Sequence, residues 1–382
     1  MVIINGVIHP VDGPVIPCGV VSWEGERITG VGPMEALAQG ELEDLGEVID
    51  AKGGHVTPGY IDAHCHLGVF GDALGFEGED GNEATDPITP HLSALDALNP
   101  MDRCFAEARQ AGVTTVVTGP GSANPIGGQL VCVKTWGDVA DEMVVRSPAA
   151  MKMATGENPK QVYHDRKESP TTRMTTAALI RGGLQKAKVY GEKVGRGETP
   201  DFDAKCQALL PVLSGDLPVH IHAHRADDMA TALRLGREFG LKLVLVHGTE
   251  GHLIADTVAA NRCPVIVGPN LTDRSKPELK NASLTTPATL AKAGVKVALC
   301  TDHPEIPVQY LPLCAALAMR GGMTEDEALA AITLNPAEIL GLGDSLGSLT
   351  VGKEADIVLT PGHPFDPTVV PSAVILGGRR VL

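Results

Sequence analysis

Residues 58–66 read PGYIDAHCH, and this stretch decides the fold and points to the chemistry. An apolar run that follows Pro-Gly is typical of a buried strand, and this run ends in two histidines separated by one residue. Side chains two positions apart on a strand point to the same side, so His64 and His66 present two imidazoles to one point. Neutral imidazole binds zinc, iron, manganese and nickel, so the pair predicts one side of a metal site.

The composition favours a large α/β enzyme and excludes several partners. The chain has 382 residues, of which 43% are hydrophobic and only 3% aromatic. This length suits one barrel of about 250 residues with a smaller companion domain. A core of Val, Leu, Ile and Ala is what parallel strands covered by helices prefer. The formal net charge of −16, with no Lys/Arg-rich run, argues against nucleic acid or an anionic membrane surface as a partner.

The sequence also predicts where the protein works. The start, MVIING, lacks the basic and apolar regions of a secretory signal, and no apolar segment approaches the ~20 residues that span a membrane. Eight scattered cysteines without a CxxC pair are typical of reduced thiols in a cytoplasmic protein. Strand alternation indicates that Cys65 and Cys300 pack away from the metal site. We expect a cytoplasmic protein that acts on a small molecule, and the general preference for dimers predicts a homo-oligomer.

The order of apolar runs predicts the domain plan. Residues 1–57 and 345–382 alternate short apolar runs with turn residues, which is a β-meander pattern. Between them, eight strands are predicted at residues 60–66, 113–118, 130–133, 149–154, 219–224, 242–247, 264–267 and 295–302. Helices are predicted near residues 101–111, 174–193, 227–239, 251–260, 286–293, 311–320 and 324–333. This is the element count of a (β/α)8 barrel, whose long loop 68–100 follows the first strand, where specificity usually lies.

Catalytic groups in such barrels sit at the C-terminal ends of the strands. Besides the first-strand pair, His222, His247 and Asp302 close the predicted fifth, sixth and eighth strands. Lys152 lies inside the apolar fourth strand, where an ammonium is costly unless its charge is neutralised or reversed. These positions predict one metal-centred site at the end of the barrel.

The chain resembles the amidohydrolase superfamily in the stretch 58–66, in TLNPA at 333–337 and in GKEADIV at 352–358. Local similarity is greatest to the imidazolonepropionase and Xaa-Pro dipeptidase-like branches. The resemblance implies a (β/α)8 TIM barrel at 58–344 and a small β-sandwich domain composed of 1–57 with 345–382. It also implies a metal-dependent hydrolase of an amide or cyclic amide C–N bond, rather than of ordinary peptide bonds.

The resemblance extends to the roles of individual residues. It implies one or two divalent metal ions, with zinc first and manganese, iron or nickel as alternatives, held by His64, His66, His222, His247 and Asp302. A metal-activated hydroxide would be the nucleophile. Asp302 would accept its proton and deliver it to the leaving nitrogen. Asp302 and His247 are the catalytic candidates.

The fourth-strand ligand has two candidates. Lys152 matches the position at which binuclear members carry an N6-carboxylysine, an anionic oxygen ligand. Glu157, just past the strand, resembles the glutamate ligand of the deacetylase branch. Lys152 and Glu157 therefore both remain candidates for this ligand. His91, His224 and Arg225 are candidates for binding the substrate, because arginine can hold a carboxylate with two parallel hydrogen bonds and His224 lies near the mouth of the barrel.

Two other functions are weighed against this one. A mononuclear aromatic deaminase of the same superfamily carries His-x-x-Glu at strand five, but here Arg225 lies three residues beyond His222 and Asp227 three beyond His224. A non-catalytic scaffold on the same barrel would lose metal ligands, whereas this chain keeps a complete set. Both observations favour the hydrolase.

Overall fold

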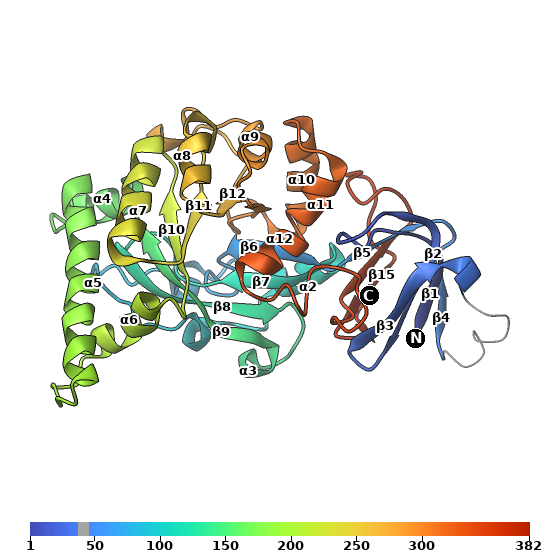
Figure 1. Ribbon diagram of the computed structural model, residues 1–382, viewed down its shortest axis with the longest axis horizontal. Coiled ribbons are helices and arrows are strands. Elements are labelled where there is room, and N and C mark those ends of the chain that lie inside the picture. Colours follow the sequence, from blue (N-terminus) through green and yellow to red (C-terminus); the bar gives the residue numbers. More distant parts are fainter. Residues whose placement is uncertain (37–45) are drawn as a thin grey trace.

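The computed structural model describes residues 1–36 and 46–382, so residues 37–45 of the predicted N-terminal domain lie outside the described residues. Figure 1 shows a barrel packed with helices and, beside it, a second sheet that holds both chain termini. Each body has its own core, and the larger core lies between the barrel strands and the surrounding helices. Among the described residues, none of the helices combines the length and apolarity needed to cross a membrane.

Eight strands form the barrel sheet, in the order β13-β12-β11-β10-β9-β8-β7-β6. Their bounds are β6 Tyr60–Cys65, β7 Val113–Thr118, β8 Ile126–Lys134, β9 Val144–Ala154, β10 Val219–Ala223, β11 Leu243–His247, β12 Val265–Val267 and β13 Val297–Leu299. Backbone hydrogen bonds from His66 to His303 and from Asp302 to His64 join the two outer strands at their ends. The predicted barrel class and all eight predicted strands are confirmed.

One strand runs in an unexpected direction. β8 pairs antiparallel with both β7 and β9, whereas the neighbours from β9 to β13 are parallel. The connection from β7 to β8 spans only residues 119–125. A parallel crossover needs a dozen or more residues, so this short connection permits only a hairpin-like return.

Most of the helices lie around the barrel sheet (Figure 1), whereas Ile339 of the last helix packs against the inner-face residues Val246 and Ile266. They are α2 Arg103–Gln110, α3 Ala140–Met143, α4 Glu157–Asp165, α5 Arg173–Gly195, α6 Ala204–Ser214, α7 Ala226–Phe239, α8 Ala255–Ala260, α9 Thr286–Lys292, α10 Leu311–Arg320, α11 Glu325–Ala330 and α12 Leu334–Ile339. In α7, Met229, Ala232, Leu233 and Gly236 recur at helical spacing and are buried. Gly240 then ends the helix in the left-handed conformation that glycine adopts without strain.

Strands from both chain ends form one second sheet, in the order β16-β15-β14-β5-β1-β2-β3, with β4 paired to β1. They are β1 Val2–Ile8, β2 Ile16–Glu24, β3 Arg27–Pro33, β4 Val48–Asp50, β5 His55–Pro58, β14 Ile357–Thr360, β15 Ala373–Leu376 and β16 Arg379–Arg380. The antiparallel pairing of β5 with β14 joins the N-terminal and C-terminal parts. The domain boundaries at 57/58 and 344/345 stay a prediction.

Candidate metal centre

Two groups of potential ligands gather at the C-terminal ends of the barrel strands. The first contains His64, His66 and Asp302, and the second contains His222, His224 and His247. Within each group, the candidate ligand atoms lie within 4.8 Å of one another. The ring centroids of His64 and His247 are 5.5 Å apart, and those of His222 and His247 are 4.5 Å apart. The two groups therefore surround a common space.

Backbone carbonyls fix the orientation of two of these rings. Nδ1 of His66 lies 2.7 Å from the carbonyl oxygen of Gly119, and Nδ1 of His247 lies 2.7 Å from that of Gly268. A carbonyl only accepts, so Nδ1 carries the proton and Nε2 keeps the lone pair that binds a metal. Burial lowers the pKa of His247 to about 4, which holds its ring neutral.

Several buried ring nitrogens have no hydrogen-bond partner among the described residues. They include Nδ1 of His64 and both ring nitrogens of His222. Buried polar atoms are normally paired, and burial lowers the pKa of both histidines well below the usual value. Neutral imidazoles that face one another in a buried space are the donors that a divalent transition metal prefers. The residues present therefore fit a metal centre.

Lys152 lies on β9 in register with His220 of β10 and is 1% exposed. Its Nζ lies 3.0 Å from Nε2 of His64, so its hydrogen-bond partner is an imidazole rather than a carboxylate. Burial lowers the pKa of the amine to about 8, although the charge of Asp302 acts in the opposite direction. The fourth strand thus brings a readily deprotonated amine to the ligand groups.

Asp302 follows β13 and faces the first-strand histidines. Its Oδ1 lies 3.4 Å from Nε2 of His64 and 3.3 Å from Nε2 of His66. Burial favours the neutral acid, but the neighbouring imidazoles of His247, His64 and His66 outweigh burial and lower the pKa of Asp302 well below its usual value. The carboxylate is thus ionised and can accept a proton.

Asp62 is a buried carboxyl whose role the sequence analysis missed. It accepts hydrogen bonds from the backbone N–H of His64, at 3.2 Å, and from the hydroxyl and N–H of Thr301. Burial raises its pKa to about 7. Asp62 thereby links β6 to the segment that carries Asp302. Its presence in an apolar strand was the signal that could have revealed it.

A cavity of about 380 Å³ opens on the centre, and its lining includes His66, His222, His224, Asp302, Asn158 and Lys276. His224 was predicted to bind substrate, and the structure places it in the second ligand group. Its Nδ1 lies 2.7 Å from the hydroxyl of Thr249. His224 is thus a neighbour of His222 and His247 as well as part of the cavity wall.

Three predicted residues are not brought to the ligand groups. Glu157 begins α4, where its carboxylate accepts a hydrogen bond at 3.3 Å from the backbone of Glu278. His91 is exposed in the 68–100 loop. Arg225 pairs with Asp227 at 2.8 Å and lines a neighbouring cavity together with Glu157. Whether they contribute to function stays a prediction.

The expectation that Cys65 and Cys300 both point away from the site was wrong for Cys300. Cys65 packs in the core beneath the helices. Cys300 instead packs with Val246, Ile266 and Ala298, which are neighbours in register on the inner face of the barrel. Cys300 follows Ala298 by two positions, so alternation itself puts both on the same side.

Two further residues of the site were missed because they lie in the loop after β12. Glu278 is fully buried in the short 3-10 helix Pro277–Leu279, and its Oε1 lies 3.5 Å from Nε2 of His224 and 3.7 Å from Nε2 of His222. Lys276 Nζ lies 3.0 Å from the same oxygen. No periodicity marks this loop, so only the fold reveals these neighbours.

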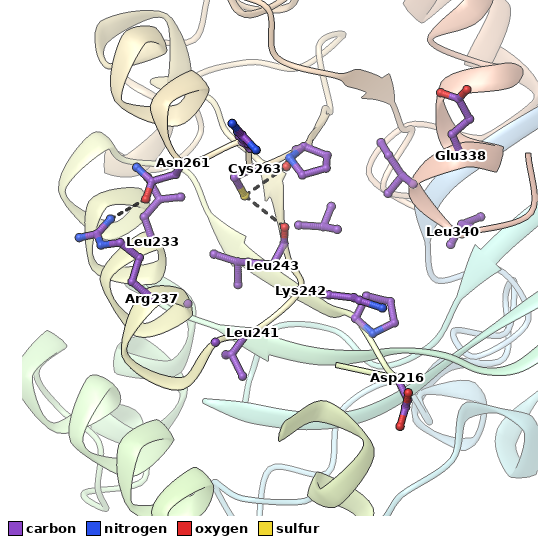
Figure 2. Close-up of a pocket in the computed structure, with 18 of the residues that line it drawn as sticks. Asp216, Leu233, Arg237, Leu241, Lys242, Leu243, Asn261, Cys263, Glu338 and Leu340 are labelled. Carbon is purple, nitrogen blue, oxygen red and sulfur yellow. Dashed lines mark hydrogen bonds between the residues drawn. The ribbon is translucent and has the colours of Figure 1, made fainter. Parts of the chain in front are cut away.

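The largest cavity described, about 670 Å³, lies elsewhere (Figure 2). Lys242, Leu243 and Cys263, which line it, stand at the starts of β11 and β12. His247 ends β11, five residues after Lys242, about 16 Å along the strand. In barrels of this kind the chemistry sits at the opposite, C-terminal end of the strands. Size alone therefore does not identify the site.

The comparisons with known proteins agree with this geometry. The model of the amidohydrolase family matches residues 55–381. The chain is similar to the amidohydrolase tasK of Hapsidospora irregularis, with 30% identity over 88% of this chain and 37% of that protein. It is also similar to an imidazolonepropionase of Symbiobacterium thermophilum, with 28% identity over 92% of this chain and 86% of that protein.

A solved structure resembles the whole chain. The crystal structure of an amidohydrolase from Thermotoga maritima MSB8 superposes with a TM-score of 0.95 and 42% sequence identity, and it covers 100% of this chain and 99% of that one. The chain therefore belongs to the amidohydrolase family and is a hydrolase of carbon–nitrogen bonds other than ordinary peptide bonds.

Proposed function

We propose that this protein hydrolyses the C–N bond of a small amide or cyclic amide at a centre of divalent metal ions. The observation that carries the proposal is the meeting of two ligand groups around one cavity, with Lys152 beside His64. The likeness to imidazolonepropionases supports a cyclic amide, and the cavity of about 380 Å³ lies at the small end of the range for small-molecule sites.

His64, His66 and Asp302 would hold one metal ion, and His222 and His247 a second. When bound, such ions supply a water of lowered pKa and polarise the carbonyl of the substrate. Zinc fits these histidine and carboxylate ligands, and manganese, iron and nickel fit them as well. The carbonyls of Gly119 and Gly268 would keep the Nε2 atoms of His66 and His247 aimed at the metals.

Lys152, as an N6-carboxylysine, is our choice for the fourth-strand residue that would hold the metal. Carboxylation requires the neutral amine, and a pKa of about 8 makes that form accessible near neutrality. The product is an anion, which replaces a costly buried ammonium by an oxygen ligand among neutral histidines. Glu157 is the weaker candidate because its carboxylate is engaged with the backbone of Glu278.

Asp302 would perform the proton transfers. As the water attacks the carbonyl carbon, the carboxylate can accept its proton, since it is ionised and lies against the first-strand histidines. The same carboxyl group can then donate this proton to the nitrogen that leaves. One residue thus serves as base and then as acid in a single turnover.

One observation bears on aromatic deamination as the alternative. That reaction needs a glutamate that donates a proton, and Glu278 is the carboxylate nearest to the strand-five histidines. Burial acts to raise the pKa of Glu278, but the neighbouring His224 and Lys276 lower it overall. An ionised Glu278 is a poor proton donor, so we favour the hydrolase.

Metal content tests the proposal directly. Protein purified without chelator and in the presence of bicarbonate should contain about two metal ions per chain by elemental analysis. Lys152→Ala should lower this number, and the matched variant Glu157→Gln should not. About one metal per chain, unchanged in Lys152→Ala but lost in Glu157→Gln, would transfer the ligand role to Glu157. Protein without any bound metal would refute the proposed centre.

A further inference from the structure

The cavity at the metal centre is electrically asymmetric. Asp302 and Glu305 line one part of it, and Lys276 is the only Lys or Arg among its lining residues, all of which lie in the described part of the chain. Glu278, the partner of Lys276, is 0% exposed and does not line the cavity. A molecule that enters therefore meets the ammonium of Lys276 but not the carboxylate that balances it.

Lys276 is held in place on two sides. Its Nζ lies 3.0 Å from Oε1 of Glu278 and donates to Oδ1 of Asn158 at 3.2 Å. The Asn158 amide is fixed in turn by a hydrogen bond of 2.7 Å to Ser122, which also lines the cavity. An ammonium has three donors, so one remains for a ligand once these two are engaged.

Glu278 is itself anchored between two loops. Its backbone N–H donates to Glu157, and its carboxylate accepts from the backbone N–H of Glu157, each at 3.3 Å. The ammonium is thus supported by a buried group that cannot swing away. Such preorganisation lowers the cost of binding an anion, because the donor does not have to be ordered when the ligand arrives.

We propose that Lys276, together with Asn158 and Ser122, forms a carboxylate subsite, and that the substrate is an amide or cyclic amide carrying a carboxylate. This inference rests on the proposed function, because it assumes that the reacting C–N bond lies at the neighbouring metal centre. The small cavity suits molecules of the size of N-acyl amino acids or lactam carboxylates. The carboxylate would accept from Lys276 while the scissile carbonyl faces Asp302.

The test compares matched ligands that differ only in this group. N-acetyl-L-leucine and 5-oxo-L-proline carry the carboxylate, and their primary amides, N-acetyl-L-leucinamide and 5-oxo-L-prolinamide, do not. Binding is measured by titration calorimetry on metal-loaded Asp302→Asn protein, and hydrolysis on the metal-loaded wild type. We expect at least one carboxylate to bind about 10- to 100-fold more tightly than its amide, the range that one hydrogen bond to a charged group supplies.

Variants of Lys276 separate binding from structural effects. Lys276→Met should abolish the preference for the carboxylate and raise KM far more than it lowers kcat, whereas Lys276→Arg should restore much of the preference. Lys276→Met/Glu278→Gln removes the unpaired buried carboxylate and should still lack the preference. Lys280→Met, an exposed lysine of the same loop that does not line the cavity, is the matched control and should behave as the wild type.

The outcomes distinguish this inference from the proposed function. If neither carboxylate binds better than its amide, or if Lys276→Met keeps the preference, the subsite is refuted even when amides are hydrolysed. If the carboxylates bind through Lys276 but the metal-loaded wild type hydrolyses none of the four compounds, the result counts against the proposed reaction on these amides and supports the subsite.

Discussion

Replacing Lys152 by methionine should stabilise the metal-free protein while removing the metal ligand proposed at this position. Lys152 is 1% exposed, and burial lowers the pKa of its amine from 10.5 to about 8. That difference of about 2.5 units corresponds to about 3 kcal/mol at pH 7, since each unit is worth 1.36 kcal/mol. Methionine has a similar volume and no charge, so it removes this penalty without leaving a large cavity.

The substitution also removes a hydrogen bond, and this loss partly offsets the gain in the free energy of unfolding. Lys152 donates to Nε2 of His64, and the substitution removes that hydrogen bond, which is worth about 1 kcal/mol. His64 can shift its proton to Nε2 and donate to Asp302, whose Oδ1 lies 3.4 Å away. We therefore expect the free energy of unfolding to rise by about 2 kcal/mol. For 382 residues, with an unfolding entropy of about 2 cal/mol/K per residue, this raises Tm by about 2–3 °C.

The assay is thermal unfolding of chelator-treated protein, without bicarbonate, at pH 7 and near pH 10. In the wild type, the buried ammonium of Lys152 destabilises the fold by its full amount below the folded pKa of about 8. This destabilisation decreases as the pH rises toward the unfolded pKa of 10.5. In that window the unfolded chain binds more protons than the folded one, so wild-type stability rises with pH. The advantage of Lys152→Met should therefore shrink between pH 8 and pH 10.5.

Lys134→Met supplies the matched control, because the same substitution should act in the opposite direction. Lys134 is largely buried, with its Nζ 2.6 Å from Asp356 and 2.8 Å from Glu354. Burial acts against its charge, but these carboxylates raise the pKa of Lys134. Removing the cation leaves two acids unpaired and should destabilise the protein by about 3–5 kcal/mol. A metal-free Lys152→Met protein that is less stable than the wild type at pH 7 would refute the reasoning.

Three further outcomes follow from the contacts of the centre. Asp302→Asn should keep the fold, as judged by circular dichroism, but lower kcat by at least about 100-fold, because the amide cannot accept the proton; full activity would contradict its role as base. Thr301→Val removes one donor to Asp62 and should lower the free energy of unfolding by about 1–3 kcal/mol in urea titrations; no change would show that the bond is dispensable. Cys65→Ala should cost stability through lost packing and leave the metal content unchanged by elemental analysis.

The spacing of apolar residues, and the Gly and Pro residues that bound the apolar runs, were sufficient to predict the barrel. Apolar runs bounded by Gly and Pro correspond to all eight strands, and the helix at 227–239 agrees with α7 to within one residue. The antiparallel direction of β8 could not be predicted in this way, because side chains alternate identically in parallel and antiparallel strands. Only the seven residues at 119–125, too few for a crossover, carried the information.

The site was predictable where alternation or a strand end determines position. His64 and His66 lie with ring centroids 5.0 Å apart, as spacing by two suggests, and Lys152 meets them from β9. Lys276 and Glu278 lie in a loop without periodicity, and their contacts exist only because the loop after β12 packs against the start of α4. Residues contributed by such loops depend on tertiary packing, which local sequence patterns do not encode.

For His247, strand alternation alone predicts the wrong orientation of the side chain. It pairs in register with Ala223 and Val267, whose side chains pack in the core beneath the helices, so a regular strand would direct its ring away from the cavity. Its φ of 76° bends the chain at this position, and Asp302 has a φ of 55°. For residues other than glycine this conformation costs about 1–2 kcal/mol. Glycine would relieve that strain but would carry no imidazole or carboxylate. The fold thus tolerates local strain at two of its candidate metal ligands, and the surrounding barrel core stabilises the chain enough to keep them there.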